Sequence, residues 1–372
     1  MKNIPFLKPN LVKHGTYLKY LEQMEQSGIY SNYGPLNTLF EDRVLQEHFG
    51  GEGSVTTVSN ATMGLILAIS QHRRPKGRYA LMPSFTFTAT PLAALWCGLE
   101  PYFIDIDPKT WCMDENKLHD VLSKLGSRAA VVVPYAAFGT DMDLTVYRDM
   151  ENRGIPVVVD AAASFGTTGE SGQFGKQFTG LVVYSFHATK CFAIGEGGMV
   201  YSADREKINK IRQAANFGFE TSRESLQQGL NAKLSELGAS VALSTLDVFS
   251  EKISRRRALH GLYVHLIRET GLLSQGWVLQ QENGQIAYQF FSILSPAGVD
   301  NLDVVDYLAG KQIQARNYFS PACHQHPLFR SFHRSDMEAT EEVASRVLSL
   351  PLWEDMTENE IRCVVEELGR YG

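Results

Sequence analysis

The chain has 372 residues, more than one hydrophobic core usually serves, so we expect two domains. Hydrophobic residues make up 44% and charged residues 20% of the chain, which is typical of a globular protein and excludes disordered and fibrous classes. The formal net charge is −6, and the basic residues are scattered apart from the run Arg255-Arg256-Arg257. Nucleic-acid binding therefore has little electrostatic support.

The cysteines predict free thiols in a reducing compartment, because they are odd in number, widely spaced and form no CxxC pair. This spacing also gives no indication of a zinc site. The N-terminal residues lack the apolar core of a signal peptide, and no stretch reaches the roughly 18 apolar residues of a membrane span. We expect a cytoplasmic protein with no metal and no membrane partner. The five cysteines are Cys97, Cys112, Cys191, Cys323 and Cys363.

Between about residues 55 and 205, short β-branched runs alternate with helical patterns, which is typical of βαβ units. Several runs are continuously apolar, as expected for a mainly parallel sheet with helices on both faces. Ligands bind such sheets beyond the carboxyl ends of the strands. The expected helices are 61–71, 89–97 and 144–153. The expected strands are 80–82, 101–104, 130–133, 157–159, 181–186 and 199–201.

Past the last of these strands the pattern changes. One long helical stretch covers 239–267, strand-rich stretches follow at 277–279 and 287–293, and helices end the chain. The change predicts a large α/β domain over residues 1–245 and a smaller α+β domain over residues 246–372.

A lysine near the end of one predicted strand is the leading candidate for chemistry. The strand at 181–186 delivers Ser185, Thr189 and Lys190 to its carboxyl end, and a glycine-rich turn follows. A buried amine beside other positive charge loses its proton more easily, and a neutral amine can form a Schiff base with an aldehyde such as pyridoxal phosphate. The alternative interpretation is a surface lysine that ends a strand.

A carboxylate at the end of the preceding strand favours the catalytic interpretation. Asp160 follows the apolar run Val157 to Val159. A carboxylate that faces a pyridine nitrogen keeps this nitrogen protonated, which makes the ring an electron sink. Alternatively, Asp160 caps a turn.

Two further segments suit the same cofactor. Residues 58–62 form a strand-to-helix turn, whose free N–H groups and helix dipole can bind a phosphate, although Ser and Asn are also common helix caps. Residues 82–90 follow a strand and can place an aromatic ring against a planar cofactor, the alternative being an aromatic residue of the core.

In chain order, the phosphate turn, the aromatic, the aspartate and the lysine resemble those of the fold-type-I aminotransferases. The resemblance is strongest to the DegT/DnrJ/EryC1/StrS family of sugar aminotransferases and extends over nearly the whole chain. It implies the α/β fold of a fold-type-I transferase. Other family-like stretches are Gly34-Pro35 ahead of a helix, 103–108, 138–143, 195–198, 229–231, 255–257 and 348–352.

Carried over residue by residue, the resemblance implies that pyridoxal 5'-phosphate is the cofactor. It makes Lys190 the Schiff-base lysine and proton shuttle, Asp160 the partner of the pyridine nitrogen, and Phe87 the ring-stacking aromatic. A related branch dehydrates sugars and carries histidine in place of the lysine. Lys190 argues against that branch, and the neighbouring His187 does not occupy that position.

The phosphate contacts also follow from the resemblance, which assigns them to Ser185, Ala61 and Thr62. Asn231 matches an asparagine that reaches the phosphate of the neighbouring subunit. A homodimer with shared active sites is therefore implied.

Two positions depart from the family pattern. Ala163 stands where glutamine or histidine usually lies near the ring hydroxyl of the cofactor, and Lys233 stands where arginine is usual. The contacts to the ring hydroxyl therefore differ from the family pattern.

The resemblance implies that L-glutamate donates the amino group, leaving 2-oxoglutarate, and that a nucleotide-linked keto sugar receives it. We expect amination of dTDP-4-keto-6-deoxy-D-glucose at C4, for O-antigen or another surface polysaccharide. Amination at C3 and a UDP-linked sugar stay open. An inactive regulatory homologue is a further alternative, which the retained Lys190 and Asp160 disfavour.

Overall fold

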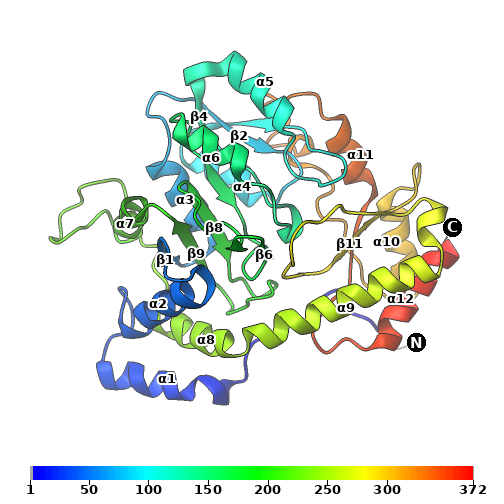
Figure 1. Ribbon diagram of the computed structural model, residues 1–372, viewed down its shortest axis with the longest axis horizontal. Coiled ribbons are helices and arrows are strands. Elements are labelled where there is room, and N and C mark those ends of the chain that lie inside the picture. Colours follow the sequence, from blue (N-terminus) through cyan, green and yellow to red (C-terminus); the bar gives the residue numbers. More distant parts are fainter. Residues whose placement is uncertain (1–2, 372) are drawn as a thin grey trace.

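A mainly parallel sheet lies at the centre of the computed structural model, which describes residues 3–371 (Figure 1). A four-stranded and a three-stranded group meet through the bridges Val132–Val157 and Tyr135–Asp160, giving the order β1-β9-β8-β5-β4-β2-β3. Within the described residues, β9 alone runs against its neighbours in this sheet. The strands are β1 (Ser54–Val58), β2 (Tyr79–Pro83), β3 (Glu100–Ile104), β4 (Ala129–Val132), β5 (Val158–Asp160), β8 (Leu181–Ser185) and β9 (Gly198–Ser202). The predicted mainly parallel sheet is confirmed.

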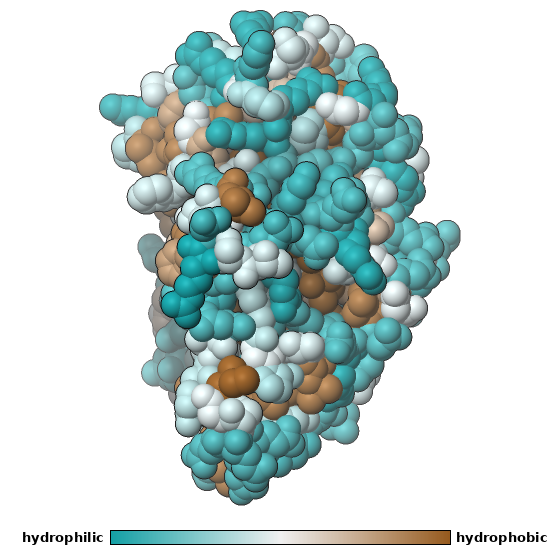
Figure 2. All heavy atoms as spheres, turned by 90° about the vertical axis from the view of Figure 1, so that its left-hand side faces the viewer, coloured by the Kyte–Doolittle hydropathy of each residue, from teal (hydrophilic) through white to brown (hydrophobic). Residues whose placement is uncertain are grey.

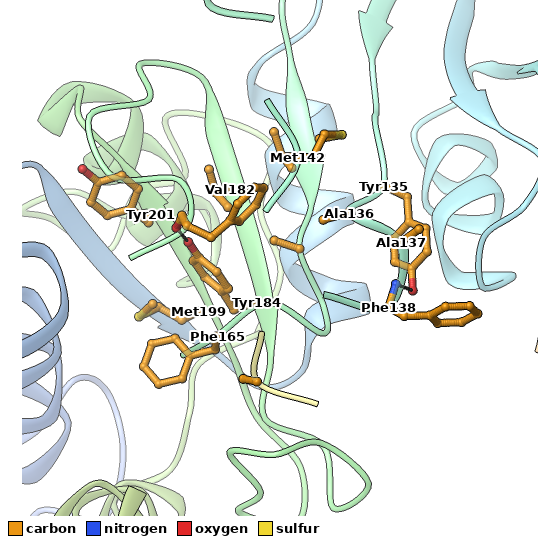
Figure 3. Packing of buried hydrophobic residues seen from close by; sticks show 14 of the residues in the cluster. Tyr135, Ala136, Ala137, Phe138, Met142, Phe165, Val182, Tyr184, Met199 and Tyr201 are labelled. Atoms are coloured by element: carbon orange, nitrogen blue, oxygen red, sulfur yellow. Dashed lines mark hydrogen bonds between the residues drawn. The ribbon is translucent and has the colours of Figure 1, made fainter. Parts of the chain in front are cut away.

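Helices cover both faces because the side chains of each strand alternate between two apolar layers. On β8, Val182 and Tyr184 share a core cluster with α2, α5, α6 and α8, whereas Leu181 and Val183 share one with α3, α4 and α7. Figure 3 shows part of the first layer, where Tyr184 lies beside Met199 of β9, and Val182 is paired with Tyr201 of the same strand. The helices are α2 (Pro35–Phe49), α3 (Ala61–Gln71), α4 (Ala89–Trp96), α5 (Glu115–Leu125), α6 (Thr145–Asn152), α7 (Arg205–Ala214) and α8 (Glu236–Asp247).

Local sequence signals explain where several of these helices begin. The Asn60 side chain accepts a hydrogen bond from the N–H of Met63 at 2.9 Å and so caps α3. Asp114 and Asp204 cap α5 and α7 in the same way. Pro35 is the first residue of α2. Proline has no backbone N–H, but the N–H groups at the start of a helix have no acceptor within the helix, so no hydrogen bond is lost. α3, α5 and α7 therefore begin after loops that leave the sheet, whereas α2 follows the loop after α1 (His14–Ser27).

The six predicted strands are confirmed as β2, β3, β4, β5, β8 and β9, and the predicted helices as α3, α4 and α6. The sequence predicts only the end of β1, through the strand-to-helix turn at 58–62, because Ser-Val-Thr-Thr-Val has few apolar residues. Residues of α2 satisfy the polar groups of Thr57 in this strand. Thr57 donates its backbone N–H to Glu41 at 2.8 Å and its hydroxyl to Asn37.

The predicted single helix over 239–267 is wrong at one residue. The chain leaves the helical conformation at Val248, with φ −116° and ψ 5°, and resumes as α9 (Phe249–Glu269). The two halves pack against different neighbours: α8 contacts α1 (His14–Ser27) and α2, whereas α9 contacts α12 (Glu358–Tyr371). Because α8 and α9 pack against different helices, their axes point in different directions. The periodicity of apolar residues does not reveal this change of direction.

A second, antiparallel sheet of three short strands lies in the part after α9 (Figure 1, yellow to red). The predicted strand over 287–293 begins later than expected, because Ala287 donates its N–H to the hydroxyl of Thr167 at 3.1 Å instead of to a strand. The elements here are β10 (Val278–Leu279), β11 (Phe291–Leu294), β12 (Val347–Leu350), α10 (Asn301–Gly310) and α11 (Glu338–Arg346). A short hairpin elsewhere in the chain consists of β6 (Thr168–Gly169) and β7 (Gly172–Gln173).

The second half of α9 and the part that follows it share a separate apolar cluster, which also includes Ile4. Ile4 forms a parallel bridge with Ile313, so the beginning of the chain packs against its C-terminal part. The division into residues 1–245 and 246–372 stays a prediction. No helix within residues 3–371 combines the length and the apolarity needed to cross a bilayer.

Candidate active site

Lys190 lies five residues beyond the carboxyl end of β8 and is half-buried. Its Nζ donates a hydrogen bond to Oε1 of Gln289 at 3.0 Å. Burial lowers the pKa of Lys190 to about 8, although the Asp160 carboxylate opposes this shift. A larger fraction of the amine is neutral near pH 7 than in an exposed lysine, and a nucleophilic amine must be neutral.

Asp160 ends β5 and is only 3% exposed. One carboxylate oxygen accepts the hydroxyl of Thr90 at 2.6 Å, and the other accepts the N–H of Ala162 at 3.1 Å. Burial raises the pKa of Asp160, whereas these two hydrogen bonds and the positive charge of Lys190 lower it. A carboxylate has about four acceptor positions, so this one can accept another donor.

The predicted phosphate contacts meet at one edge of the sheet. Gly198, at the start of β9, pairs with Ser185 at the end of β8 and with Val58 at the end of β1. Helix α3 begins at Ala61, and a Cβ placed on Gly198 would lie 2.8 Å from the Ala61 nitrogen. The N–H groups of Ala61 and Thr62 belong to the first helical turn, which has no intrahelical acceptors. The three predicted phosphate contacts are therefore brought together.

Phe87 lies between β2 and α4, and 55% of its surface is exposed. Its ring centroid lies 6.3 Å from that of Phe319 at a tilt of 50°. The adjacent Thr86 hydroxyl contacts the Thr90 hydroxyl at 3.0 Å, and Thr90 in turn donates to Asp160. Phe87 therefore presents an open aromatic surface, and its segment is linked to the buried carboxylate.

Asn231 is exposed, and no side-chain hydrogen bond joins it to Lys190, Asp160 or Ser185 within the described part of the chain. It follows an exposed segment of residues 220–226 that projects beside α7 at the left of Figure 1. The structure of one chain therefore does not place Asn231 among the other predicted residues. The role of Asn231 in a second subunit stays a prediction.

The two positions that depart from the family pattern have different surroundings. Ala163 is 7% exposed and carries no polar group. Lys233 donates to the side chain of Asn216 at 2.8 Å, and its Nζ lies 4.8 Å from the ring centroid of Phe217. Burial lowers the pKa of Lys233.

Two residues that the sequence does not single out contact the site directly. Gln289 contacts the amine of Lys190, and Thr90 contacts the carboxylate of Asp160. Thr90 belongs to the stretch 82–90, so its position gives a weak signal. Gln289 stands between aromatic residues ahead of β11, in a pattern that predicts only a strand.

Pyridoxal phosphate fits the groups present. Its carbonyl carbon can react with the amine of Lys190, whose pKa is lowered. Its protonated ring nitrogen can donate a hydrogen bond to the buried carboxylate of Asp160, which can accept a further donor. Its phosphate matches free N–H groups at a helix start beside Ser185, where Gly198 leaves room because it has no Cβ. Within the described residues, no cluster of three His, Cys, Asp or Glu side chains could hold a metal ion.

Known proteins share this architecture over nearly their whole length. The family model described as the DegT/DnrJ/EryC1/StrS aminotransferase family matches residues 13–369. A crystal structure from Bacillus cereus, provisionally assigned as a PLP-dependent aminotransferase, has a TM-score of 0.98 and 46% identity, covering 99% of this chain and 100% of that chain. The structure of DesI in the presence of its TDP-sugar product has a TM-score of 0.88 and 31% identity, covering 99% and 93% of the two chains.

A named enzyme is also similar over most of both chains. The dTDP-4-amino-4,6-dideoxy-D-glucose transaminase of Escherichia coli is 27% identical, covering 96% of this chain and 95% of its own length. The predicted family, fold type and cofactor are confirmed. The chain belongs to the DegT/DnrJ/EryC1/StrS aminotransferase family and is a pyridoxal-phosphate-dependent sugar aminotransferase.

Proposed function

We propose that this protein transfers the amino group of L-glutamate to C4 of dTDP-4-keto-6-deoxy-D-glucose. The product is the 4-amino-4,6-dideoxy sugar nucleotide, a building block for O-antigen or another surface polysaccharide. The name of the Escherichia coli relative supports the position and the nucleotide, and the TDP-sugar product seen with DesI supports the nucleotide. The observation that carries the reaction class is the half-buried Lys190, whose amine interacts electrostatically with the Asp160 carboxylate at the carboxyl edge of the sheet.

Lys190 and Asp160 would divide the chemistry. When bound, pyridoxal phosphate supplies a conjugated ring that stabilises negative charge on the substrate carbon. Lys190 Nζ is the covalent anchor and, once released, takes the proton from the amino-bearing carbon of glutamate. In the second half of the reaction it returns a proton to C4 of the sugar. Asp160 keeps the ring nitrogen protonated, which a neutral side chain cannot do.

The other predicted residues would bind and orient the cofactor. The N–H groups of Ala61 and Thr62 and the hydroxyl of Ser185 would hold the phosphate at the start of α3, where the helix dipole favours negative charge. Phe87 would stack on the ring with its exposed face. Holding both ends of the cofactor fixes the substrate carbon relative to Lys190, as proton transfer requires.

A homodimer would complete each site, with Asn231 of one subunit at the phosphate site of the other. Large exposed apolar side chains support an interface on the side that carries the projecting segment. Phe217 and Leu226 are 45% and 64% exposed, and Tyr30 and Leu237 are 56% and 54% exposed. Tyr30 and Leu237 lie near each other, since Glu236, the residue before Leu237, donates its N–H to the carbonyl oxygen of Tyr30 at 3.0 Å. Figure 2, which views this side, shows brown apolar patches among hydrophilic residues.

A panel of keto sugar nucleotides tests the proposed substrate. The purified protein is mixed with L-glutamate and sugars that carry dTDP or UDP and a keto group at C3 or C4. We expect the highest kcat/KM with dTDP-4-keto-6-deoxy-D-glucose, and no product with Lys190→Ala. Lys124→Ala, which changes an exposed lysine outside the site, is the matched control. A higher kcat/KM with a UDP-linked or C3-keto sugar would overturn the substrate assignment.

The same preparation separates an enzyme from an inactive homologue. Glutamate should change the absorbance of the bound cofactor within one turnover, because the amino group passes to it. A protein that binds the cofactor but shows no absorbance change at saturating glutamate would be a binding homologue.

A further inference from the structure

Gln289 makes a two-point contact around the proposed catalytic lysine. Its Oε1 accepts the hydrogen bond from Nζ of Lys190 at 3.0 Å, and its Nε2 donates to the hydroxyl of Thr189 at 3.3 Å. The Thr189 hydroxyl also contacts Nδ1 of His187 at 2.9 Å. The two contacts orient the amide so that its oxygen faces the amine.

The backbone of Gln289 is held by Arg256, which also forms a buried ion pair. Nη1 of Arg256 donates to the carbonyl oxygens of Gln289 at 2.9 Å and Tyr288 at 3.0 Å. Nε and Nη2 of Arg256 contact the two carboxylate oxygens of Glu354 at 3.0 and 3.3 Å. Arg256 is 2% exposed and Glu354 is 8% exposed, so the planar guanidinium is fixed in place.

The large α/β part holds the same segment further upstream. Ala287 donates its N–H to the Thr167 hydroxyl at 3.1 Å, and Gln285 exchanges backbone hydrogen bonds with Thr168 at 2.8 and 3.0 Å. The main chain of residues 285–289 is thus attached to both parts of the molecule. The Gln289 amide therefore faces Lys190 from a fixed support rather than from a free loop.

We propose that Gln289 is a positioning residue that holds the Lys190 amine whenever this amine is detached from the cofactor. The inference rests on the proposed function, in which the free amine moves the proton. An amide oxygen accepts a hydrogen from a neutral or a charged amine, so it orients Lys190 without adding charge. A carboxylate at this position would favour the protonated amine more strongly than the amide does, because it adds a negative charge, and a protonated amine cannot accept a proton from the substrate.

The first test measures the protonation of Lys190 in the full-length protein with its cofactor. The protein is first treated with glutamate, so that the Lys190 amine is free of the cofactor. Acetic anhydride labels neutral amines across a pH series, and mass spectrometry quantifies the Lys190 peptide. We expect Gln289→Leu to lower the apparent pKa of Lys190 by about one unit, because an acceptor of the ammonium is lost. Gln289→Glu should raise this pKa, because it adds a negative charge.

Gln281→Leu is the matched control, since Gln281 is exposed on the same segment. It should leave the pKa of Lys190 unchanged. Equal pKa values in the wild type and both Gln289 variants would overturn the proposal. Gln289→Glu is nearly isosteric, so it keeps the test decisive if Gln289→Leu does not fold.

The second test follows one turnover with glutamate that carries deuterium at its amino-bearing carbon. We expect Gln289→Leu to slow the absorbance change about tenfold and to increase the isotope effect, with the dissociation constant of glutamate within about twofold of wild type. An unchanged isotope effect with lower thermal stability would indicate a structural role and overturn the proposal.

Borohydride reduction of the wild-type holoenzyme tests the role of Lys190 separately from the role of Gln289, because it fixes the cofactor on the lysine that binds it. A cofactor fixed on the Lys190 peptide supports the proposed function on which the role of Gln289 rests. A cofactor fixed on another lysine would reject that function, whatever the Gln289 variants show.

Discussion

Lys190 and Asp160 owe opposite pKa shifts to the same cause. Burial disfavours the charged form of both groups, so it lowers the pKa of the amine and raises that of the carboxylic acid. Their mutual attraction opposes both shifts. A cofactor that offers a carbonyl carbon to the amine and a protonated nitrogen to the carboxylate would suit both groups at once.

The pKa of about 8 predicts how cofactor capture depends on pH. Only the neutral amine attacks a carbonyl, and below the pKa its fraction rises about tenfold per pH unit. The initial rate at which apoprotein captures pyridoxal phosphate should therefore rise from pH 6 to about 8 and level off above. Stopped-flow absorbance measures this rate. A rate that keeps rising to pH 10 would indicate an amine with the ordinary pKa of 10.5.

Asp160→Asn should keep the cofactor bound yet lose several orders of magnitude in the rate of the glutamate half-reaction. The amide has a similar shape, but it cannot hold the ring nitrogen protonated. Absorbance gives cofactor content and rate in the same sample. Asp149→Asn changes an exposed carboxylate outside the site and is the control. A near wild-type rate for Asp160→Asn would remove Asp160 from its proposed role.

The sequence singles out Lys190 and Asp160 because each follows an apolar strand, and parallel strands bring their carboxyl ends together. The contact between Lys190 and Gln289 has no such signal. The two residues are 99 positions apart in the sequence. Their contact depends on the position of the backbone at Gln289, which Arg256 holds by a hydrogen bond. Geometry of this kind follows from tertiary packing and not from local pattern.

At the scale of elements, the antiparallel strand β9 places Gly198 between the end of β8 and the start of α3, the two elements that carry the proposed phosphate contacts. A Cβ on Gly198 would lie 2.8 Å from the Ala61 nitrogen and 2.9 Å from the Tyr184 carbonyl oxygen. Gly198→Ala should therefore push the start of α3 away from β8 and weaken cofactor binding at least tenfold, as measured by equilibrium dialysis.

Gly261→Ala is the matched control, because Gly261 lies in α9 and a Cβ there meets nothing within 4 Å. It should leave cofactor affinity unchanged and raise the free energy of unfolding by about 0.5–1 kcal/mol, since alanine favours helices. Wild-type affinity in Gly198→Ala would show that the close contacts relax without moving the phosphate site.

The sequence predicts the apolar strands and capped helices well, because alternation and caps are local signals. It predicts neither the break at Val248 nor the strand β12. Val248 separates α8, which contacts α1 and α2, from α9, which contacts α12, and β12 is a strand because it pairs with β11. Both features depend on partners distant in sequence.

At the scale of the whole molecule, subunit mixing tests the proposed sharing of sites. Lys190→Ala and Asn231→Asp should each be inactive alone, the second because a carboxylate repels the phosphate. In a mixed dimer one site receives both defects and the other receives neither. Random exchange of equal amounts makes about half of the dimers mixed, so activity should recover to about a quarter of wild type under twofold symmetry.

Two measurements make this result interpretable. Native mass spectrometry must show that subunits exchange, and Asn231→Asp must be inactive alone. If both conditions hold and activity does not return, each site is built within one chain. Recovery would instead show that Asn231 acts on the partner.

The projecting segment of residues 220–226 also bears on how long a chain survives in a cell. Its exposed Arg223 is the kind of residue after which trypsin-like proteases cut. In the proposed dimer this segment would lie against the second subunit, out of reach of such enzymes. Chains without a partner would then be degraded first, and the abundance of the protein would rise more steeply than its rate of synthesis.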